Sequence, residues 1–340
     1  MSVLDRLNSL QDAPAPDFIT GPAIAAFVAN ARKQMAVVQP GAEKAFAEEM
    51  AARPVAEYTE AANAQHYELP ARFFELALGP NRKYSSAFYD HASATLAEAE
   101  VSALRQTCDH ADLQDGQNVL ELGCGWGSLS LWMARHYPAS TITAVSNSRS
   151  QKAAIDAEAA LLGLTNLTVV TADMNVFQTE QRFDRIVSVE MFEHMANWRE
   201  LLGRVRTWLK PEGRVFIHVF SHVTTPYRFE VSDRADFIAQ HFFTGGIMPS
   251  HGLMRQYADL FEVEQDWRWS GTHYQRTANH WLENFDRNET EIRGLMKDVY
   301  GVDYALWMRR WRRFFMATAG LFGDSDGQVW GVSHYRLKGV

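Results

Sequence analysis

The stretch NVLELGCGWGSLSLWMARHY, residues 118–137, decides the fold class. A β-like run at 118–122 is followed by a turn with the spacing G-x-G-x-G and then by a helical run. The three glycines are Gly123, Gly125 and Gly127. Glycines let the backbone turn tightly and approach a ligand, and the N-terminus of the helix offers free N–H groups. This order predicts a ligand site at the end of the first strand of a parallel sheet.

The alternation of strand-like and helical runs continues along the chain. The strand-like runs that follow are 141–145, 167–172, 183–189, 213–220, 261–269 and 328–338. Helical runs of about 10–15 residues separate most of them, which indicates a parallel sheet with right-handed crossovers. The sequence therefore predicts an α/β fold with a Rossmann-like seven-stranded sheet.

Two kinds of segment flank this pattern. Residues 1–80 are rich in Ala and Glu and are broken by prolines into short helices, so we expect residues 1–100 to form a helical N-terminal cover. The main domain is then 101–340. Within it, 221–260 is expected to be an insertion between the fifth and sixth strands, and 270–325 to add helices on the substrate side.

Composition excludes several classes of protein. The chain has 340 residues, a net charge of −8 and 46% hydrophobic residues, which argues against a disordered chain and against a dedicated nucleic-acid binder. Its two cysteines, Cys108 and Cys124, cannot form a disulfide scaffold. The start lacks the pattern of a signal peptide, and no uncharged apolar stretch reaches the roughly 18 residues of a membrane span. We therefore expect a soluble, cytoplasmic protein.

The glycine turn favours one cofactor over another. A dinucleotide site needs the spacing G-x-G-x-x-G and an acidic residue at the end of the second strand, where this chain has the neutral Ser146 and Asn147. These departures point away from NAD and toward S-adenosylmethionine (SAM), which has no phosphate and carries a cationic sulfonium. Glu121 could then attract the cationic end of the cofactor, and Asp173 could accept a hydrogen bond from the adenine amino group.

The fourth strand-like run leads into Glu190, Glu193 and His194. These residues follow the carboxyl end of the strand, which is where open α/β sheets bind their ligands. If residues 190–194 form a helical turn, these three side chains share one face. Two carboxylates and an imidazole can hold a cationic amine and remove its proton. The alternative is that the carboxylates only cap a helix and that the histidine is structural.

Taken together, the motifs resemble the cyclopropane-fatty-acid-synthase-like family of SAM-dependent methyltransferases, and within it the coclaurine N-methyltransferase type. The resemblance runs from about residue 55 to the C-terminus. The motifs are KYSSAFY (83–89), ELGCGWGSLSLWMARHYP (121–138), SNSRSQK (146–152), VEMFEHM (189–195), HFFTGG (241–246), GTHYQRT (271–277) and WGVSHY (330–335). The resemblance implies a class I methyltransferase fold, and SAM as the cofactor with S-adenosylhomocysteine (SAH) as its product.

The resemblance also implies roles for individual residues. Those toward the cofactor are Tyr84 and Ser85 at its methionine part, Gly123, Gly125 and Gly127 along it, Asn147 and Gln151 at the ribose, and Asp173 and Met174 at the adenine. Glu190, Glu193 and His194 match the acid/base cluster associated with amine methylation. The side chains expected to wall the substrate pocket are Ser86, His218 and Tyr274 from the resemblance, and Phe242 and Trp330 because aromatic residues are concentrated late in the chain.

Two functions stay open at this point. The first is N-methylation of a small, aromatic or cyclic, tetrahydroisoquinoline-like amine. The second is methylene or methyl transfer to an unsaturated acyl chain of a lipid. In the lipid relatives a bicarbonate ion is bound by a Cys, a Glu, a His and a Tyr; Glu193, His218 and Tyr274 match three of these, and Ser86 replaces the Cys. This replacement weakens the lipid alternative without removing it.

The remaining expectations concern partners. We expect a small-molecule amine and no nucleic acid, while a homodimer is compatible with the sequence. His218 and His222 are spaced H-x3-H, but no third ligand is apparent, so we expect no metal site. Residues 304–315 (YALWMRRWRRFF) are either a core-packing helix with an arginine face or, if the lipid alternative holds, a helix that contacts the membrane.

Overall fold

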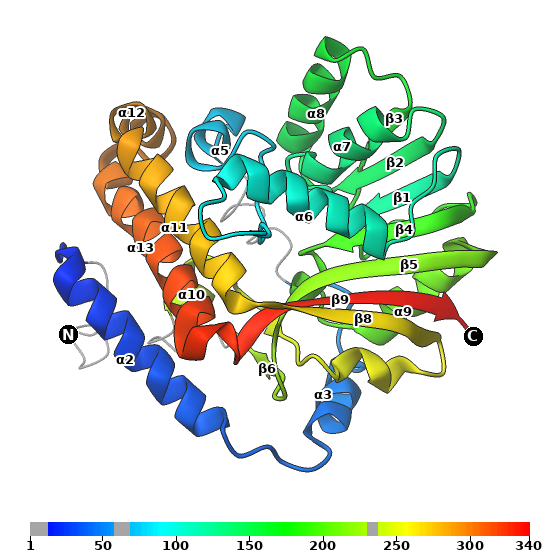
Figure 1. Ribbon diagram of the computed structural model, residues 1–340, viewed down its shortest axis with the longest axis horizontal. Coiled ribbons are helices and arrows are strands. Elements are labelled where there is room, and N and C mark those ends of the chain that lie inside the picture. The colour runs from blue at the N-terminus through cyan, green and yellow to red at the C-terminus, as the bar shows by residue number, and fades with distance from the viewer. Residues whose placement is uncertain (1–12, 58–68, 230–236) are drawn as a thin grey trace.

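A computed structural model describes residues 13–57, 69–229 and 237–340. Its centre is a seven-stranded sheet in the order β3-β2-β1-β4-β5-β9-β8 (Figure 1). The strands are β1 (Asn118–Leu122), β2 (Thr141–Ser146), β3 (Leu167–Thr171), β4 (Phe183–Val189), β5 (Leu209–His222), β8 (Phe261–Ser270) and β9 (Trp330–Gly339). The first five are parallel, and β9 runs antiparallel to both β5 and β8. The predicted seven-stranded α/β fold is confirmed.

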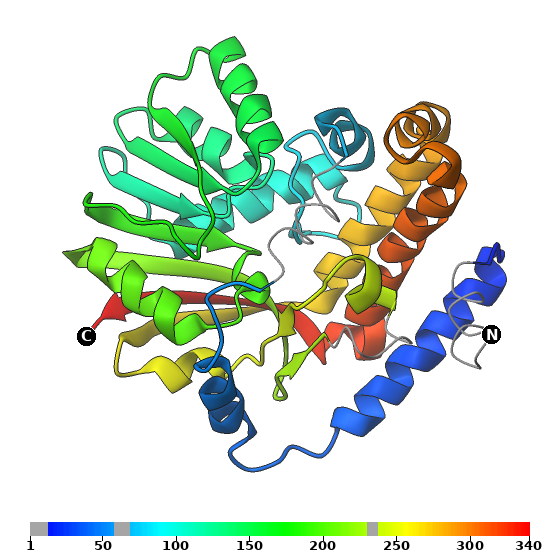
Figure 2. The ribbon, with the colours of Figure 1, turned by 180° about the vertical axis from the view of Figure 1, so that it is seen from behind.

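Helices cover both faces of this sheet, which is why its central strands read as continuous apolar runs. Residues 119–122 of β1 are all buried. The flanking helices are α6 (Leu96–His110), α7 (Ser128–His136), α8 (Arg149–Leu161) and α9 (Trp198–Trp208). Helix α6 crosses one face of the sheet in Figure 1, and α9 lies on the opposite face, seen in Figure 2.

Helix α6 begins with a capping box. The Thr95 hydroxyl accepts a hydrogen bond from the Glu98 backbone N–H, and the Glu98 carboxylate accepts one from the Thr95 backbone N–H at 2.8 Å. We expect Thr95→Ala to lower the free energy of unfolding by about 1 kcal/mol, because the Glu98 backbone N–H at the helix start loses its acceptor. Urea titration measures this loss. Ser102→Ala, inside the same helix, should show no such loss, and equal stability of the two variants would contradict the prediction.

The expected insertion follows β5. It contains β6 (Tyr227–Arg228), α10 (Phe237–His241), β7 (Ile247–Met248) and the short helix η2 (Leu253–Tyr257), while residues 230–236 lie outside the described part of the chain. Strands β6 and β7 pair with each other as a separate small sheet. The insertion thus lies between the fifth and sixth strands of the main sheet, as the sequence predicts.

The segment between β8 and β9 is helical. It consists of α11 (Gly271–Arg287), α12 (Glu289–Tyr300), η3 (Gly301–Asp303), α13 (Tyr304–Gly323) and η4 (Asp324–Gly327). In α13, Trp311 and Phe315 are almost fully buried, and Arg312 forms ion pairs with Asp17 and Asp286. The core-packing interpretation of residues 304–315 is therefore confirmed. Among the described helices, none combines the length and the apolar character that crossing a bilayer requires.

The described N-terminal helices lie at several separate places on the molecule. Helix α2 (Asp17–Met35) lies along α13 at the outer edge of the molecule (Figure 2). Helix α3 (Ala42–Met50) contacts α9 and η2, and α5 (Ala71–Ala77) contacts α11 and α8. Residues 1–12 and 58–68 of the predicted cover lie outside the described residues. The described N-terminal helices therefore pack against different helices of the molecule.

Candidate active site

Two adjoining cavities, of about 100 and 90 Å³, lie beyond the carboxyl ends of the parallel strands. Both are lined by Gly123, Gly125, Gln151, Glu190 and His194. Shared walls mean that one ligand can extend from the first cavity into the second. This is the place where an open α/β sheet binds its ligand.

The glycine turn forms the common wall. Gly123 has φ +78°, and a Cβ at this position would come within 2.7 Å of the Met191 Cβ. Gly125 also has a positive φ, and a Cβ there would meet no atom within 4 Å. Gly127 is the N-cap of α7 and packs against Ile155, so it shapes the turn and lines neither cavity.

Glu121 is buried at the base of the first cavity. The Ser130 hydroxyl donates a hydrogen bond to its carboxylate, and burial raises the pKa of Glu121 to about 7. A cationic ligand beside this carboxyl would compensate the loss of solvent and favour its ionised form. The site therefore fits the cationic end of SAM.

Further polar groups in the walls have room for a ligand. Within the described part of the chain, Gln151 Nε2 and Ser128 Oγ are buried without a hydrogen-bond partner. Both residues line the first cavity. Since buried polar groups in folded proteins are nearly always paired, these two atoms fit a polar cofactor bound at this place. Sequence reasoning selected Gln151 but missed Ser128, which follows the glycine turn at the first position of α7.

The second cavity receives the residues expected at the adenosine end. Asn147, Asp173 and Met174 line it, together with Ala56 from the N-terminal region and Met195. The Asp173 carboxylate accepts a hydrogen bond from the Asn175 N–H at 2.7 Å. The methionine-end residues Tyr84 and Ser85 line the first cavity instead. The structure therefore separates the two groups of predicted cofactor residues along one continuous site.

Glu190 lies between β4 and the short helix η1 (Phe192–His194), and its backbone has φ +48°. The predicted helical turn over 190–194 is thus wrong in its extent, since only 192–194 is helical. Three groups donate to the carboxylate or lie within hydrogen-bond distance of it. They are the Ser86 N–H (3.2 Å), the Tyr274 hydroxyl (2.7 Å) and His218 Nε2 (3.2 Å).

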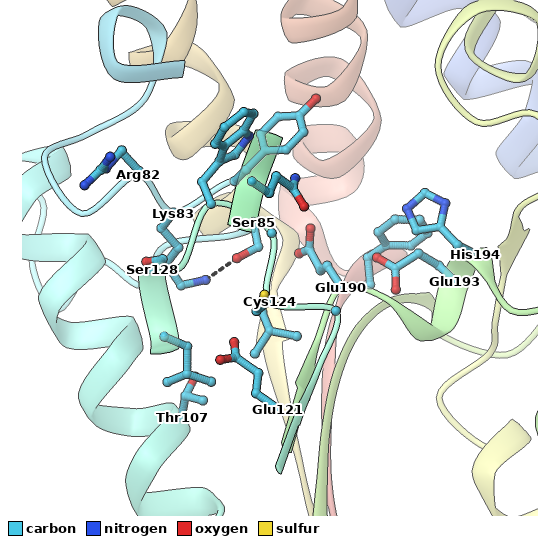
Figure 3. Close-up of a pocket in the computed structure, with 18 of the residues that line it drawn as sticks. Arg82, Lys83, Ser85, Thr107, Glu121, Cys124, Ser128, Glu190, Glu193 and His194 are labelled. Atoms are coloured by element: carbon cyan, nitrogen blue, oxygen red, sulfur yellow. Dashed lines mark hydrogen bonds between the residues drawn. The ribbon is translucent and has the colours of Figure 1, made fainter. Parts of the chain in front are cut away.

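Glu190, Glu193 and His194 nevertheless line the same cavity (Figure 3). Burial raises the pKa of Glu190 to about 7. Burial and, to a lesser degree, the neighbouring Glu190 carboxylate raise the pKa of Glu193 well above its usual value. The His194 ring stacks on Phe243 with 4.5 Å between ring centres. The cluster therefore combines a carboxyl whose pKa lies at about 7 with a second carboxyl whose pKa is also shifted well upward.

Lys83 is a second polar residue of this site that sequence reasoning missed. Its ammonium is buried and donates to the Ser85 hydroxyl at 2.5 Å and to the Ser86 carbonyl at 2.7 Å (Figure 3). Burial lowers its pKa to about 8, against the attraction of the Glu190 charge. The signal that could have found it is its place directly before the Tyr84–Ser85 pair, since an interior lysine there faces the same cavity.

The predicted substrate wall is only partly found. Tyr274 lines the first cavity, whereas Ser86 and His218 contact Glu190 without lining it. Phe242 stacks on Phe314, and Trp330 donates a hydrogen bond to the Tyr227 hydroxyl; both are fully buried and line neither cavity. The aromatic side chains that line the first cavity are Tyr84, Trp126, Phe220, Phe243, Tyr274 and Phe314.

We find no group of three or more His, Cys, Asp or Glu side chains within residues 13–57, 69–229 and 237–340 that is arranged to hold a metal ion. His218 and His222 both lie in β5. His218 contacts Glu190 and His334, while His222 Nδ1 accepts from the backbone N–H groups of Thr224 and Thr225.

Residues 56–330 match the family model described as mycolic acid cyclopropane synthetase. The chain is 35% identical over 276 residues to (S)-coclaurine N-methyltransferase of Papaver somniferum. The aligned region covers 80% of this chain and 79% of that one. It is 31% identical over 274 residues to cyclopropane-fatty-acyl-phospholipid synthase of Escherichia coli K12, with 80% and 67% covered. A crystal structure of coclaurine N-methyltransferase bound to N-methylheliamine and SAH matches with a TM-score of 0.94 at 30% identity, covering 99% of this chain and 100% of that one. The chain therefore belongs to the mycolic acid cyclopropane synthetase family and is a class I SAM-dependent methyltransferase.

Proposed function

We propose that the chain transfers a methyl group from SAM to the nitrogen of a small, aromatic or cyclic amine. The observation that carries the proposal is the Glu190 carboxylate, which is aimed into an aromatic cavity and ionises near neutral pH. An ionised carboxylate at this place attracts an ammonium group and can accept its proton. The aromatic lining adds cation–π attraction for the same charge.

The same carboxylate weighs against lipid chemistry. In the lipid relatives the groups matching His218 and Tyr274 would hold a bicarbonate ion. Here both contact the Glu190 carboxylate, which also accepts from the Ser86 N–H. The Ser86 hydroxyl donates to the Ala87 carbonyl at 3.1 Å. A side-chain carboxylate thus uses the donors that a small anion would need.

The cofactor, when bound, supplies an electrophilic methyl group on its sulfonium. The chain's own residues prepare the acceptor. Glu190 would bind the ammonium and take one proton, which frees the nitrogen lone pair and makes the amine a competent methyl acceptor. Glu121, at the base of the first cavity, would stabilise the positive charge of the cofactor. The remaining contribution is positional, because the walls hold both reactants together and exclude water.

The substrate class rests on relatives. Two of them are named for coclaurine and pavine, and the solved relative holds N-methylheliamine. We extend this to a tetrahydroisoquinoline-like secondary or primary amine for the present chain. We also propose a cytoplasmic location, since Cys108 and Cys124 are both free thiols in the interior. A homodimer stays a prediction.

SAM labelled in its methyl group tests the proposal. The label should enter tetrahydroisoquinolines or phenethylamines and should not enter unsaturated phospholipid vesicles supplied in parallel. Product analysis must place the methyl group on nitrogen. Label found in lipid alone would overturn the proposal in favour of acyl-chain modification.

Replacing Lys83 by Met is expected to move the acid limb of the kcat/KM pH profile upward by roughly one pH unit. Activity needs Glu190 ionised, and the Lys83 charge opposes the rise of its pKa caused by burial. Without that charge the pKa of Glu190 rises further, so activity is lost at neutral pH and recovered at alkaline pH. Rates at saturating SAM across the pH range measure the shift.

The matched control is Lys152→Met, which removes a more exposed lysine that pairs with Asp156. Its profile should coincide with that of the original chain. An unshifted acid limb in Lys83→Met would show that Lys83 does not set the charge of Glu190.

A further inference from the structure

Three imidazoles connect the Glu190 carboxylate with the outside of the sheet. His218 Nε2 lies 3.2 Å from Glu190 Oε1, and His218 Nδ1 lies 2.8 Å from His334 Nε2. His334 Nδ1 in turn lies 2.8 Å from His110 Nδ1. His218 and His334 are paired residues of β5 and β9 and are fully buried, whereas His110 ends α6 and is only half-buried.

All three rings are neutral near pH 7. Burial lowers the pKa of His218 and of His334 well below the usual value, and that of His110 to about 4. A neutral imidazole has one N–H donor and one acceptor nitrogen. Each ring-to-ring contact therefore needs a proton on one side only, and the tautomer of one ring fixes that of the next.

The ionised Glu190 carboxylate selects the direction. It needs a donor, so His218 carries its proton on Nε2 and accepts at Nδ1 from His334 Nε2–H. His334 then accepts at Nδ1 from His110 Nδ1–H. In the opposite direction a lone pair on His218 Nε2 would face the carboxylate, which repels it and favours protonated Glu190.

We propose that His110 and His334 are positioning residues that keep His218 in the tautomer which donates to Glu190, so that a histidine two rings away from the cavity sets the charge of the catalytic carboxylate. The proposal rests on the proposed function only in that Glu190 is taken as the base. Hydrogen bonds in such a chain polarise one another, so each ring strengthens the last bond. Loss of the His110 donor leaves His334 free to take the other tautomer. His218 then also changes its tautomer and no longer donates to Glu190.

Charged groups also act on Glu190 and on the row of three histidines. Lys83 and Glu193 act on Glu190, and Tyr274 donates to it. Asp109 and Arg336 act on His110 with opposite effects on its pKa. The His110 ring also stacks on Trp267 at 3.8 Å between ring centres. Substitutions at His110 should therefore keep a flat side chain where stacking is to be preserved.

The first test compares two substitutions at His110. His110→Phe keeps the stacking on Trp267 but removes the donor, so the acid limb of the kcat/KM profile should move upward by roughly half to one pH unit. His110→Asn places an amide N–H where Nδ1 was, so its profile should match the original. His136→Phe, which removes a histidine stacked on Trp132 away from the site, is the control and should also match. The proposal would be overturned if the acid limb lay at the same pH in all variants, or if it moved equally in His110→Phe and His110→Asn.

The second test needs no turnover. Histidine labelled with ¹⁵N, observed in the SAH complex at alkaline pH, should show the Nε2–H tautomer for His218 and His334 and the Nδ1–H tautomer for His110. Comparison with His218→Gln and His334→Gln assigns the signals. An Nδ1–H tautomer at His218 would overturn the proposal even if the enzyme methylates amines. If the tautomers were as expected but no amine were methylated, the proposal on the three histidines would stand and the proposed function would be wrong.

Discussion

Glu190→Gln is expected to lower kcat/KM for the amine about 10²- to 10⁴-fold while leaving the affinity for SAM nearly unchanged. The amide has the size of the carboxyl but has no negative charge and does not accept a proton. Its NH2 group would also meet donors, since the Ser86 N–H and the Tyr274 hydroxyl both point at the present oxygens. Steady-state rates with the amine and calorimetric titration with SAM separate the two effects.

A second carboxyl serves as the control for charge. Glu98→Gln changes the net charge by the same amount, but Glu98 is exposed at the start of α6. Its rates should stay within about twofold of the original, in line with the small effects of surface changes. If Glu190→Gln behaved like this control, Glu190 could not be the base, and the assignment would pass to Glu193 or His194.

Gly123→Ala is expected to weaken SAM binding at least tenfold and to lower the free energy of unfolding by about 2–4 kcal/mol. Gly123 has φ +78°, where a Cβ is strained, and its Cβ would lie 2.7 Å from the Met191 Cβ and 2.8 Å from the Met191 Cγ. Met191 directly follows Glu190, so the displaced backbone also carries the catalytic carboxylate. Calorimetry with SAH and urea titration measure the two losses.

Gly116→Ala separates strain from collision. Gly116 has φ +87°, but an added Cβ would meet no atom within 4 Å, and the residue lines neither cavity. This variant should lose only about 1–2 kcal/mol of stability and no SAM affinity. If both glycine variants lost affinity equally, the effect would come from general destabilisation and not from the close approach of Gly123 to Met191.

Most of the sheet could be predicted because its strands are buried on both faces and alternate with helices. The strands at 118–122 and 183–189 have the predicted bounds, whereas β5 starts at Leu209 instead of 213. The four extra residues at its start include Pro211, and Leu209 joins the sheet by pairing with Phe183. Residues 328–329 precede β9, because Ser325 and Asp326 adopt positive φ and form a turn that delays the strand.

The residues of the site could be predicted from one local motif or from the family resemblance, whereas the contacts between distant segments could not. Glu190, Glu193 and His194 stand together in the sequence and share one cavity. The partners of Glu190 lie 28 residues away at His218 and 84 residues away at Tyr274, so periodicity has no access to them. The same limit hid Lys83, and the expected Phe242 is buried away from the cavity while its neighbour Phe243 lines it.

The left-handed backbone at Glu190 sets this position apart from the rest of the cluster. A residue with a long side chain is disfavoured at φ +48°, and glycine would remove that strain. At position 190, stability therefore favours glycine, whereas catalysis requires glutamate. Random mutagenesis screened for heat resistance alone would tend to enrich glycine at 190 and yield robust but inactive enzymes. Engineering of this scaffold should hold position 190 fixed and seek stabilising changes in the helices away from the cavity.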